Sequence, residues 1–213
     1  MSNYLKQLNQ SQLSAVTNLD GPMMVIAGPG SGKTRVLTYR IARLIKSGTD
    51  AFNILALTFT NKAAKEMQNR IETIVESTEA RNLWMGTFHG VFSRMLRMEA
   101  EKINYTSNFT IYDTADSKSL IKSIIKEMGL DKDIYKAGLI QNRISALKNN
   151  FIRPEDYENS PELLQTDKIA RRTAFGNIYQ KYMQRCFKSG AMDFDDLLLN
   201  TYHLLNEFPD VLY

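Results

Sequence analysis

A glycine-rich turn at residues 27–34 places the strongest constraint on how this chain folds. It reads Ala-Gly-Pro-Gly-Ser-Gly-Lys-Thr, follows a short apolar run at 23–26, and precedes apolar residues at helical spacing over 36–47. Glycines permit positive φ angles and let backbone amides approach an anion closely, and the start of a helix adds partial positive charge. A predicted strand, turn and helix in this order are typical of a phosphate-binding loop.

The side chains of the turn supply the other groups that a nucleoside triphosphate needs. Lys33 is placed to reach the β- and γ-phosphates, and Thr34 to hold Mg²⁺. Ala27 stands where the pattern usually begins with glycine, which keeps a small residue at the turn. An ordinary Gly/Ser connection is the alternative, although Gly-Lys-Thr has no purely structural use there. The predicted phosphate-binding residues are Ala27, Gly28, Pro29, Gly30, Ser31, Gly32, Lys33 and Thr34.

Gln12, upstream of the loop, has two interpretations that the residues leave equally open. Asn9 and Gln12 have the spacing of a capping box at a helix start. Alternatively, the Gln12 amide reads the edge of an adenine, because one amide both donates and accepts a hydrogen bond.

Two further strand-to-helix junctions carry polar and aromatic residues. The first is Thr58-Phe59-Thr60-Asn61-Lys62 after a predicted strand at 53–59, and the second is Thr87-Phe88-His89 after one at 83–86. Hydroxyl, amide and ammonium groups suit phosphates, and a flat ring suits a base, so both junctions are predicted to bind single-stranded nucleic acid. The structural alternative makes Phe59 a core residue, Thr60 a helix cap and His89 a partner for a backbone carbonyl.

Composition limits the class of protein without identifying a partner. The 213 residues are 43% hydrophobic and carry a formal charge of +4, which permits a polyanionic partner. Cys186 is the single cysteine, and the sequence contains no apolar run of membrane-spanning length and no secretory leader. We therefore expect a globular protein of the reducing cytoplasm that does not enter a membrane.

These segments together resemble a known family. The match lies in Leu8-Asn9 with Gln12, AGPGSGKTRVL from Ala27, LALTFTNKAAKEM from Leu55 and GTFHG from Gly86. In order and spacing they closely resemble the N-terminal part of UvrD/Rep/PcrA-type superfamily 1 DNA helicases. The resemblance implies that Gln12 reads adenine and that Arg35 lies beside the nucleotide. It also implies that both junctions line a single-stranded DNA track.

The family resemblance implies an architecture and an activity. The fold class is α/β, with an incomplete RecA-like parallel sheet of the P-loop NTPase type at residues 1–88 and an inserted all-helical subdomain at 89–213. The intact protein is expected to be an ATP-dependent, Mg²⁺-requiring helicase that translocates 3′ to 5′ on single-stranded DNA. It would act at single-strand/duplex junctions in repair or replication.

Residues beyond about 90 show mainly helical periodicity. Basic side chains in this part either meet a nucleic-acid backbone or form solvated helix faces: Arg143, Lys148, Arg153, Lys168, Arg171 and Arg172. The acidic sequence Asp193-Phe194-Asp195-Asp196 is explained by capping and the helix dipole, so no metal is assigned to it. Cys186 lies on an apolar helix face and is predicted to be a buried small hydrophobe.

Hydrolysis in such motors also needs a carboxylate pair on another core strand and arginines that reach the γ-phosphate. No apolar run in the 213 residues ends in Asp-Glu. We therefore expect a fragment that does not hydrolyse ATP unless joined to the rest of its chain, including the second motor domain. Two alternatives remain: a small-molecule P-loop kinase with a helical lid, and a non-catalytic nucleotide- or DNA-binding module.

Overall fold

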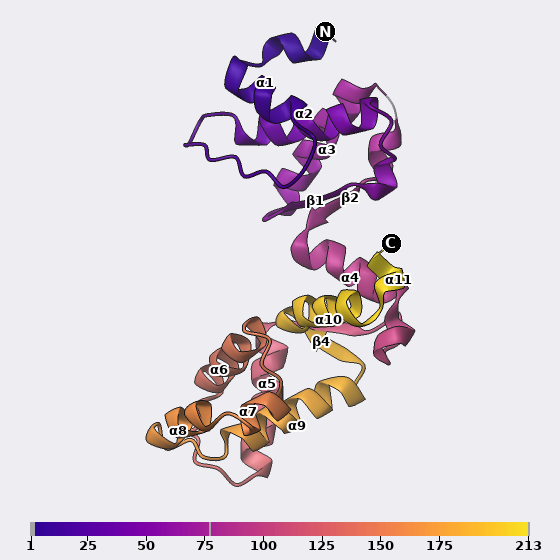
Figure 1. Ribbon diagram of the computed structural model, residues 1–213. Coiled ribbons are helices and arrows are strands. Elements are labelled where there is room, and N and C mark those ends of the chain that lie inside the picture. The colour runs from indigo at the N-terminus through magenta and orange to yellow at the C-terminus, as the bar shows by residue number, and fades with distance from the viewer. Residues whose placement is uncertain (1–2, 77, 213) are drawn as a thin grey trace. The chain divides into compact units, whose positions relative to one another are not determined.

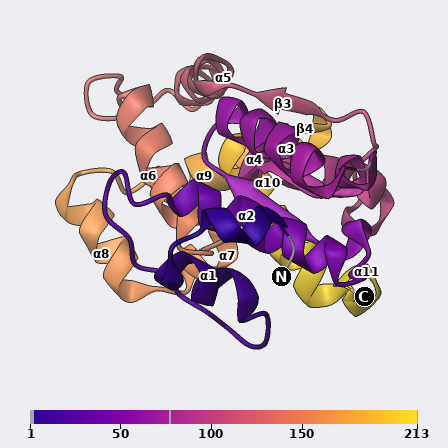
Figure 2. The ribbon, with the colours of Figure 1, turned by 90° about the horizontal axis from the view of Figure 1, so that it is seen from above.

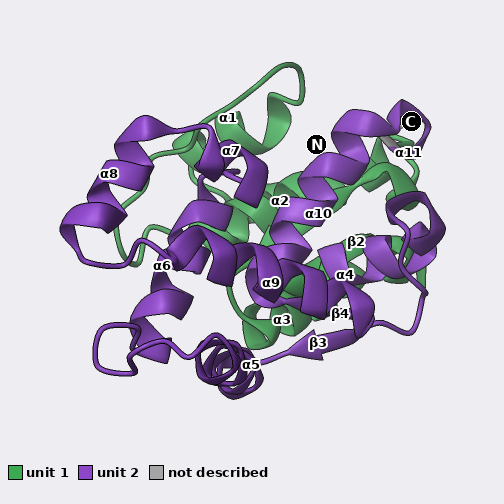
Figure 3. Cartoon of the chain, turned by 90° about the horizontal axis from the view of Figure 1, so that it is seen from below, with its two compact units in different colours: residues 1–91 green, residues 92–213 purple. Residues whose placement is uncertain are grey.

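The computed structural model describes residues 3–76 and 78–212 (Figure 1). The chain forms two compact units, residues 1–91 and 92–213 (Figure 3). Helix α4, Phe88–Met98, contains the division between them. Three residues separate this division from the one expected at 88/89.

Unit 1 contains two strands among helices. Its elements are η1 Asn3–Gln7, α1 Gln10–Thr17, α2 Lys33–Lys46, η2 Ala51–Asn53, β1 Leu55–Thr58, α3 Asn61–Val75, η3 Thr78–Asn82 and β2 Trp84–Thr87, followed by the start of α4. The strands are parallel, with Leu55 opposite Trp84 and Thr58 opposite Thr87. Helix α3 packs on both strands, and α2 packs against α3. Buried Ile41, Ala56 and Ile71 belong to the shared core, which fixes the strand ends relative to α3.

The apolar run at 23–26 is not a strand, contrary to the sequence prediction. Met24 and Ile26 are 81% and 87% exposed, and the segment is an extended coil between α1 and α2 (Figure 2). A strand needs the ladder hydrogen bonds of a neighbour, and in the described part of unit 1 the sheet consists of β1 paired with β2. Residues 23–26 are therefore apolar but exposed, because no neighbouring strand pairs with them in the described part of unit 1.

Unit 2 is mainly helical but also contains a sheet. Its elements after α4 are η4 Ala100–Ile103, β3 Thr110–Tyr112, α5 Thr114–Glu127, α6 Ala137–Asn149, α7 Pro154–Glu158, α8 Pro161–Ile169, α9 Phe175–Lys188, β4 Ala191–Asp193, α10 Phe194–Glu207 and α11 Pro209–Leu212. Strands β3 and β4 are parallel and pair Thr110 with Ala191 and Tyr112 with Asp193. The all-helical prediction was therefore wrong. Three-residue strands are too short to show an alternating pattern, and their pairing is not local.

The core of unit 2 forms where α5, α6 and α9 meet. Ile121, Ile140 and Ile178 are fully buried in it, as the helical periodicity predicts. Cys186 is buried among these apolar residues, which confirms its prediction as a small core residue. Over residues 3–76 and 78–212, no helix combines the length and the apolar character needed to cross a membrane.

Candidate nucleotide and nucleic-acid sites

The glycine-rich turn leads directly into α2. Gly30 and Gly32 have φ angles of 75° and 83°, and Gly32 is the N-cap of α2, which begins at Lys33. Because glycine has no side chain to cap the helix, the first-turn amides have no side-chain acceptor, and the first turn of α2 carries no acidic residue. An open helix start of this kind suits an anion.

Lys33 folds back over the turn. Its Nζ donates to the carbonyl oxygens of Ala27 and Gly28, each at 2.9 Å. Ser31 Oγ also donates to the Gly28 carbonyl, at 2.6 Å. These contacts hold the ammonium over the turn, so the residues present fit a polyphosphate. The neighbouring Thr34 is exposed and offers a hydroxyl oxygen of the kind that Mg²⁺ accepts as a ligand.

Gln12 connects α1 to the turn. Its Oε1 accepts from the Asn9 backbone N–H, and Asn9 Oδ1 accepts from the Gln12 backbone N–H, which confirms the capping box. Gln12 Nε2 also donates to the Ser31 carbonyl at 3.0 Å. The sequence did not predict this contact. Gln12 therefore serves a structural role at the turn, and an adenine contact by its side chain remains a prediction.

Arg35, Thr38 and Tyr39 of α2 face a cleft of about 490 Å³ that Arg70 of α3 also lines. The Arg35 guanidinium lies 5.8 Å from the centre of the Tyr39 ring. A second cleft, of about 300 Å³, is lined by Lys33 and Arg40 together with apolar Met23, Val25, Val36 and Leu37. Open space with a basic wall therefore borders both sides of the first turns of α2.

The parallel register brings the two predicted nucleic-acid junctions to one sheet edge. Thr58 and Thr87 are the last residues of β1 and β2 and lie opposite each other. Phe59 and Phe88 follow them, with ring centroids 6.0 Å apart and planes at 41°. Phe59 is 93% exposed and Phe88 37%. The alternative that Phe59 is a core residue was therefore wrong.

Threonine side chains of the two junctions form hydrogen bonds with the backbone around the Phe59 and Phe88 rings. Thr60 Oγ1 accepts from the Ala63 amide and caps α3, as its structural reading predicts. Thr87 Oγ1 accepts from the Gly90 amide at 3.2 Å, and Thr58 Oγ1 donates to the Thr60 carbonyl at 3.0 Å. Asn61 and Lys62 are exposed in the first turn of α3, and His89 is exposed in α4. The Phe59 and Phe88 rings therefore follow strand ends whose backbone is fixed by hydrogen bonds, and exposed polar side chains lie next to them in the sequence.

Some of the basic residues of unit 2 that could meet a nucleic-acid backbone form ion pairs within the protein instead. Lys148 is 2% exposed; its Nζ donates to Asp193 Oδ2 at 2.7 Å and lies 2.7 Å from Asp196 Oδ1, off the hydrogen-bond direction. Neither sequence interpretation, backbone contact or solvated face, describes this lysine. Arg143 pairs with the buried Asp167 at 3.1 Å, whereas Lys168 and Arg171 are exposed.

Asp193 and Asp196 have opposite electrostatic responses. Burial raises the pKa of Asp196 to about 6, against the lowering effect of Lys148. Burial acts in the same direction on Asp193, but the Lys148 ammonium and the donating Tyr182 hydroxyl outweigh it and lower the pKa of Asp193. Asp193 also caps α10, confirming its capping assignment. The Asp193 carboxylate adds to the raising effect at Asp196, whereas the Tyr182 hydrogen bond adds to the lowering effect at Asp193.

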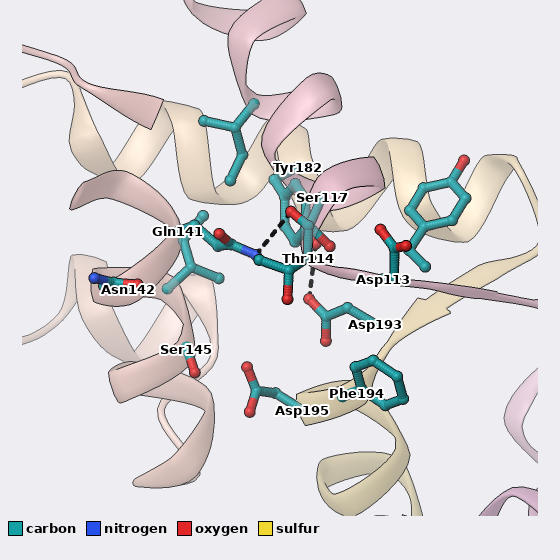
Figure 4. A pocket seen from close by; sticks show the side chains of 13 residues that line it. Asp113, Thr114, Ser117, Gln141, Asn142, Ser145, Tyr182, Asp193, Phe194 and Asp195 are labelled. Atoms are coloured by element: carbon teal, nitrogen blue, oxygen red, sulfur yellow. Dashed lines mark hydrogen bonds between the residues drawn. The ribbon is translucent and has the colours of Figure 1, made fainter. Parts of the chain in front are cut away.

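A polar pocket of about 270 Å³ lies beside this cluster (Figure 4). Its carboxylates have partners within the protein: Asp113 caps α5, Asp193 receives the Tyr182 hydroxyl, and Asp195 accepts from Asn149 at 2.9 Å. In the described ranges, no group of three or more His, Cys, Asp or Glu residues has an arrangement that would hold a metal ion. The acidic residues around this pocket therefore serve the protein's own hydrogen bonding.

Comparison of the sequence with known proteins identifies the family of this chain. The model of the UvrD/REP helicase N-terminal domain matches residues 8–213. The chain belongs to the UvrD/REP helicase family. The helicase relatives include the ATP-dependent DNA helicase PcrA of Staphylococcus epidermidis, 40% identical over 213 residues, which are 100% of this chain and 28% of the relative. PcrA of Leuconostoc citreum is 39% identical over 206 residues, covering 96% and 27%. PcrA of Staphylococcus aureus is 38% identical over 213 residues, covering 100% and 28%. The chain thus spans somewhat over a quarter of the length of these helicases.

Proposed function

We propose that this chain is the nucleotide-binding part of an ATP-dependent DNA helicase. ATP would bind at the turn formed by residues 27–35, with Gln12 at the adenine and Mg²⁺ held by Thr34 and the phosphates. Mg²⁺ there would neutralise charge on the β- and γ-phosphates. The open N-terminus of α2 and the Lys33 ammonium would meet the phosphate oxygens, once Lys33 exchanges its two carbonyl partners for phosphate.

Single-stranded DNA would bind along the edge where β1 and β2 end. The observation that carries this proposal is the exposed ring pair Phe59 and Phe88, which the register of Thr58 with Thr87 brings together. Bases stack on such rings without regard to sequence, while Asn61, Lys62 and His89 would face the phosphates. A small-molecule kinase has no use for this pair, and membership in the helicase family also favours DNA.

The whole-protein activity that follows is ATP-driven translocation along single-stranded DNA with strand separation at junctions, in DNA repair or replication. A 3′ to 5′ direction is proposed from the family resemblance. The relatives' length beyond the matched region allows for the second motor domain that this activity needs.

Two binding measurements on the 213-residue chain test the proposal. Lys33→Ala should weaken binding of a fluorescent ATP analogue with Mg²⁺ by about 1.5–3 kcal/mol, because a charged donor is lost. Lys46→Ala, in the last turn of the same helix, is the matched control and should bind normally. Equal affinity of the Lys33→Ala variant and the parent chain would remove the turn as the nucleotide site.

Phe59→Ala should weaken binding of a labelled oligothymidylate by about 1–3 kcal/mol, the contribution of one base–ring stack. Phe52→Ala removes another exposed ring, 59% accessible and located in η2, and should have no effect. If both variants bind the oligonucleotide as tightly as the parent chain, the strand edge is not the DNA site.

A further inference from the structure

A cleft in unit 2 lies outside the nucleotide and DNA sites. It has a volume of about 380 Å³ and is bordered by the second half of α5, the connection to α6 and the first residue of α6. We call it the lysine cleft and define it by Lys122, Ile125, Lys126, Lys132, Tyr135, Lys136 and Ala137. Its volume lies within the range of small ligand pockets.

The floor of the lysine cleft is apolar and held in place. Ile125 is 2% exposed and Tyr135 6%, and both belong to the main core of unit 2. The Tyr135 hydroxyl accepts from the Ala174 amide at 3.1 Å, which fixes the orientation of its ring. Little of either side chain is exposed, so the floor has no open ring face on which a base could stack, and its contact with a ligand is limited to an aliphatic side chain.

The rim of the cleft carries four positive charges. Lys122, Lys126, Lys132 and Lys136 are all exposed, and within the described ranges none of them has a carboxylate within 4.0 Å. The neighbouring acidic residue on α5, Glu127, pairs instead with Arg185 and Lys181 of α9. Asp131 and Asp133 flank Lys132 in the connection but do not line the cleft, so the charges of the lining itself are all positive and produce a local positive potential.

We propose that the lysine cleft binds an acidic peptide segment of a partner protein, with an apolar side chain on the Ile125–Tyr135 floor and carboxylates against the lysine rim. Charge complementarity selects carboxylates, and the apolar floor selects a peptide over a nucleic acid. A polynucleotide would place phosphates at the rim but would leave the floor without a suitable partner. This proposal is independent of the nucleotide and DNA sites.

The probe is a short fluorescein-labelled peptide of alternating glutamate and leucine, titrated against the 213-residue chain and followed by anisotropy. Saturable binding is expected, weakening as salt rises because exposed charges are screened. A glutamate–serine peptide tests the floor, a lysine–leucine peptide tests the charge, and an oligothymidylate tests nucleic acid. All three should bind the cleft at least about tenfold more weakly, a difference of about 1.4 kcal/mol.

Two variants locate the binding. Lys122→Glu reverses one rim charge, and Ala137→Glu places a carboxylate in the cleft at the first residue of α6. An acidic residue in the first turn favours a helix, but Ala137 is partly buried against the core of unit 2, so the melting temperature of Ala137→Glu is measured first to show that the variant folds. Each variant should weaken binding of the glutamate–leucine peptide roughly fivefold or more. Lys188→Glu makes the same charge change at an exposed residue outside the cleft and should leave binding unchanged.

Three results would overturn the proposal: no saturable binding of the glutamate–leucine peptide, equal binding of the glutamate–serine peptide, or equal weakening by Lys188→Glu. Binding of oligothymidylate that Lys122→Glu abolishes, without peptide binding, would assign the cleft to nucleic acid instead. The peptide results do not depend on ATP binding or on Phe59. Oligothymidylate binding at the cleft is lost in Lys122→Glu, whereas binding at the ends of β1 and β2 is lost in Phe59→Ala, so failure here is distinguishable from failure of the proposed function.

Discussion

The glycine at the start of α2 is restricted in two ways. Gly32 has a φ of 83°, and a Cβ added there would lie 2.9 Å from Gln12 Nε2. That nitrogen donates to the Ser31 carbonyl and so connects α1 to the turn. The backbone conformation therefore disfavours any residue with a Cβ, and such a residue would also displace the end of the flexible Gln12 side chain. By contrast, a Cβ at Gly28 meets nothing within 4 Å, and its φ is not positive.

We expect Gly32→Ala to lower the free energy of unfolding by about 1–2 kcal/mol, the cost of a left-handed conformation for a residue with a Cβ. Displacement of Gln12 should add to this cost. Urea denaturation followed by circular dichroism measures the change, with Gly28→Ala as the matched control at near-parent stability. Equal stabilities of the two variants would contradict the role assigned to the left-handed turn.

At the scale of elements, one buried ion cluster connects α6 to α10. Lys148 comes from the end of α6, Asp193 is the N-cap of α10, and Asp196 lies in its first turn. The same two aspartates form the capping box of α10. The cluster therefore fixes both where α10 begins and how it packs on α6.

Lys148→Met should lower the free energy of unfolding by about 3–5 kcal/mol at neutral pH, because it leaves two buried carboxylates without their cation. Denaturant titration measures the loss. Lys188→Met, at an exposed lysine of α9, should change stability little. A loss below about 1 kcal/mol in Lys148→Met would mean that the cluster is not held by its ion pairs.

The raised pKa of Asp196 also predicts a pH dependence with a definite sign. The pKa is raised from 3.8 to about 6, so the folded state binds this proton more strongly than the unfolded state. The resulting stabilisation is complete below about 3.8 and is lost as pH rises through about 6. Asp196→Asn removes this titration. Its stability relative to the parent chain should therefore increase from pH 4 to pH 6 and level off above pH 7.

Denaturation of both chains across this pH range measures that difference. The lowered pKa of Asp193 has the opposite sign, because its stabilisation is present above 3.8 and is lost in stronger acid. Because that loss occurs below pH 3.8, it falls outside the pH 4 to pH 7 range of the comparison. A stability difference that stays constant from pH 4 to pH 7 would contradict the assignment of the raised pKa to Asp196.

At the scale of the whole molecule, each unit has a core of its own. The core of unit 1 surrounds Ile71, and the main core of unit 2 surrounds Ile178. The residues proposed to bind nucleotide and DNA up to His89 all lie in unit 1. Unit 1 therefore contains the binding groups, but within the 213 residues no apolar run ends in the Asp-Glu pair expected for hydrolysis.

We accordingly predict that the 213-residue chain binds ATP with Mg²⁺ without turning it over. Phosphate release should stay at background with or without oligothymidylate, because positioning of water needs groups beyond the phosphate-binding turn. A coupled phosphate-release assay measures the rate. DNA-stimulated turnover that Lys33→Ala abolishes would show that these residues suffice for hydrolysis.

The sequence alone determined the features that depend on near neighbours. The Asn9–Gln12 capping box, the cap at Asp193 and the apolar helix faces around Ile121 were all predictable, because helix periodicity and caps involve residues three or four positions apart. The turn into α2 was predictable for the same reason. Its role in nucleotide binding stays a prediction.

Long-range contacts in the folded chain determine which segments pair and which side chains are buried. The tertiary structure left Ile26 without a strand neighbour, paired β3 with β4, exposed Phe59 beside Phe88, and buried Lys148 between two aspartates. Strand pairing and burial depend on segments distant in the chain, and a local pattern carries no information about which distant segment arrives. The sequence around Lys148 and Phe59 therefore does not predict that the lysine is buried and the phenylalanine exposed.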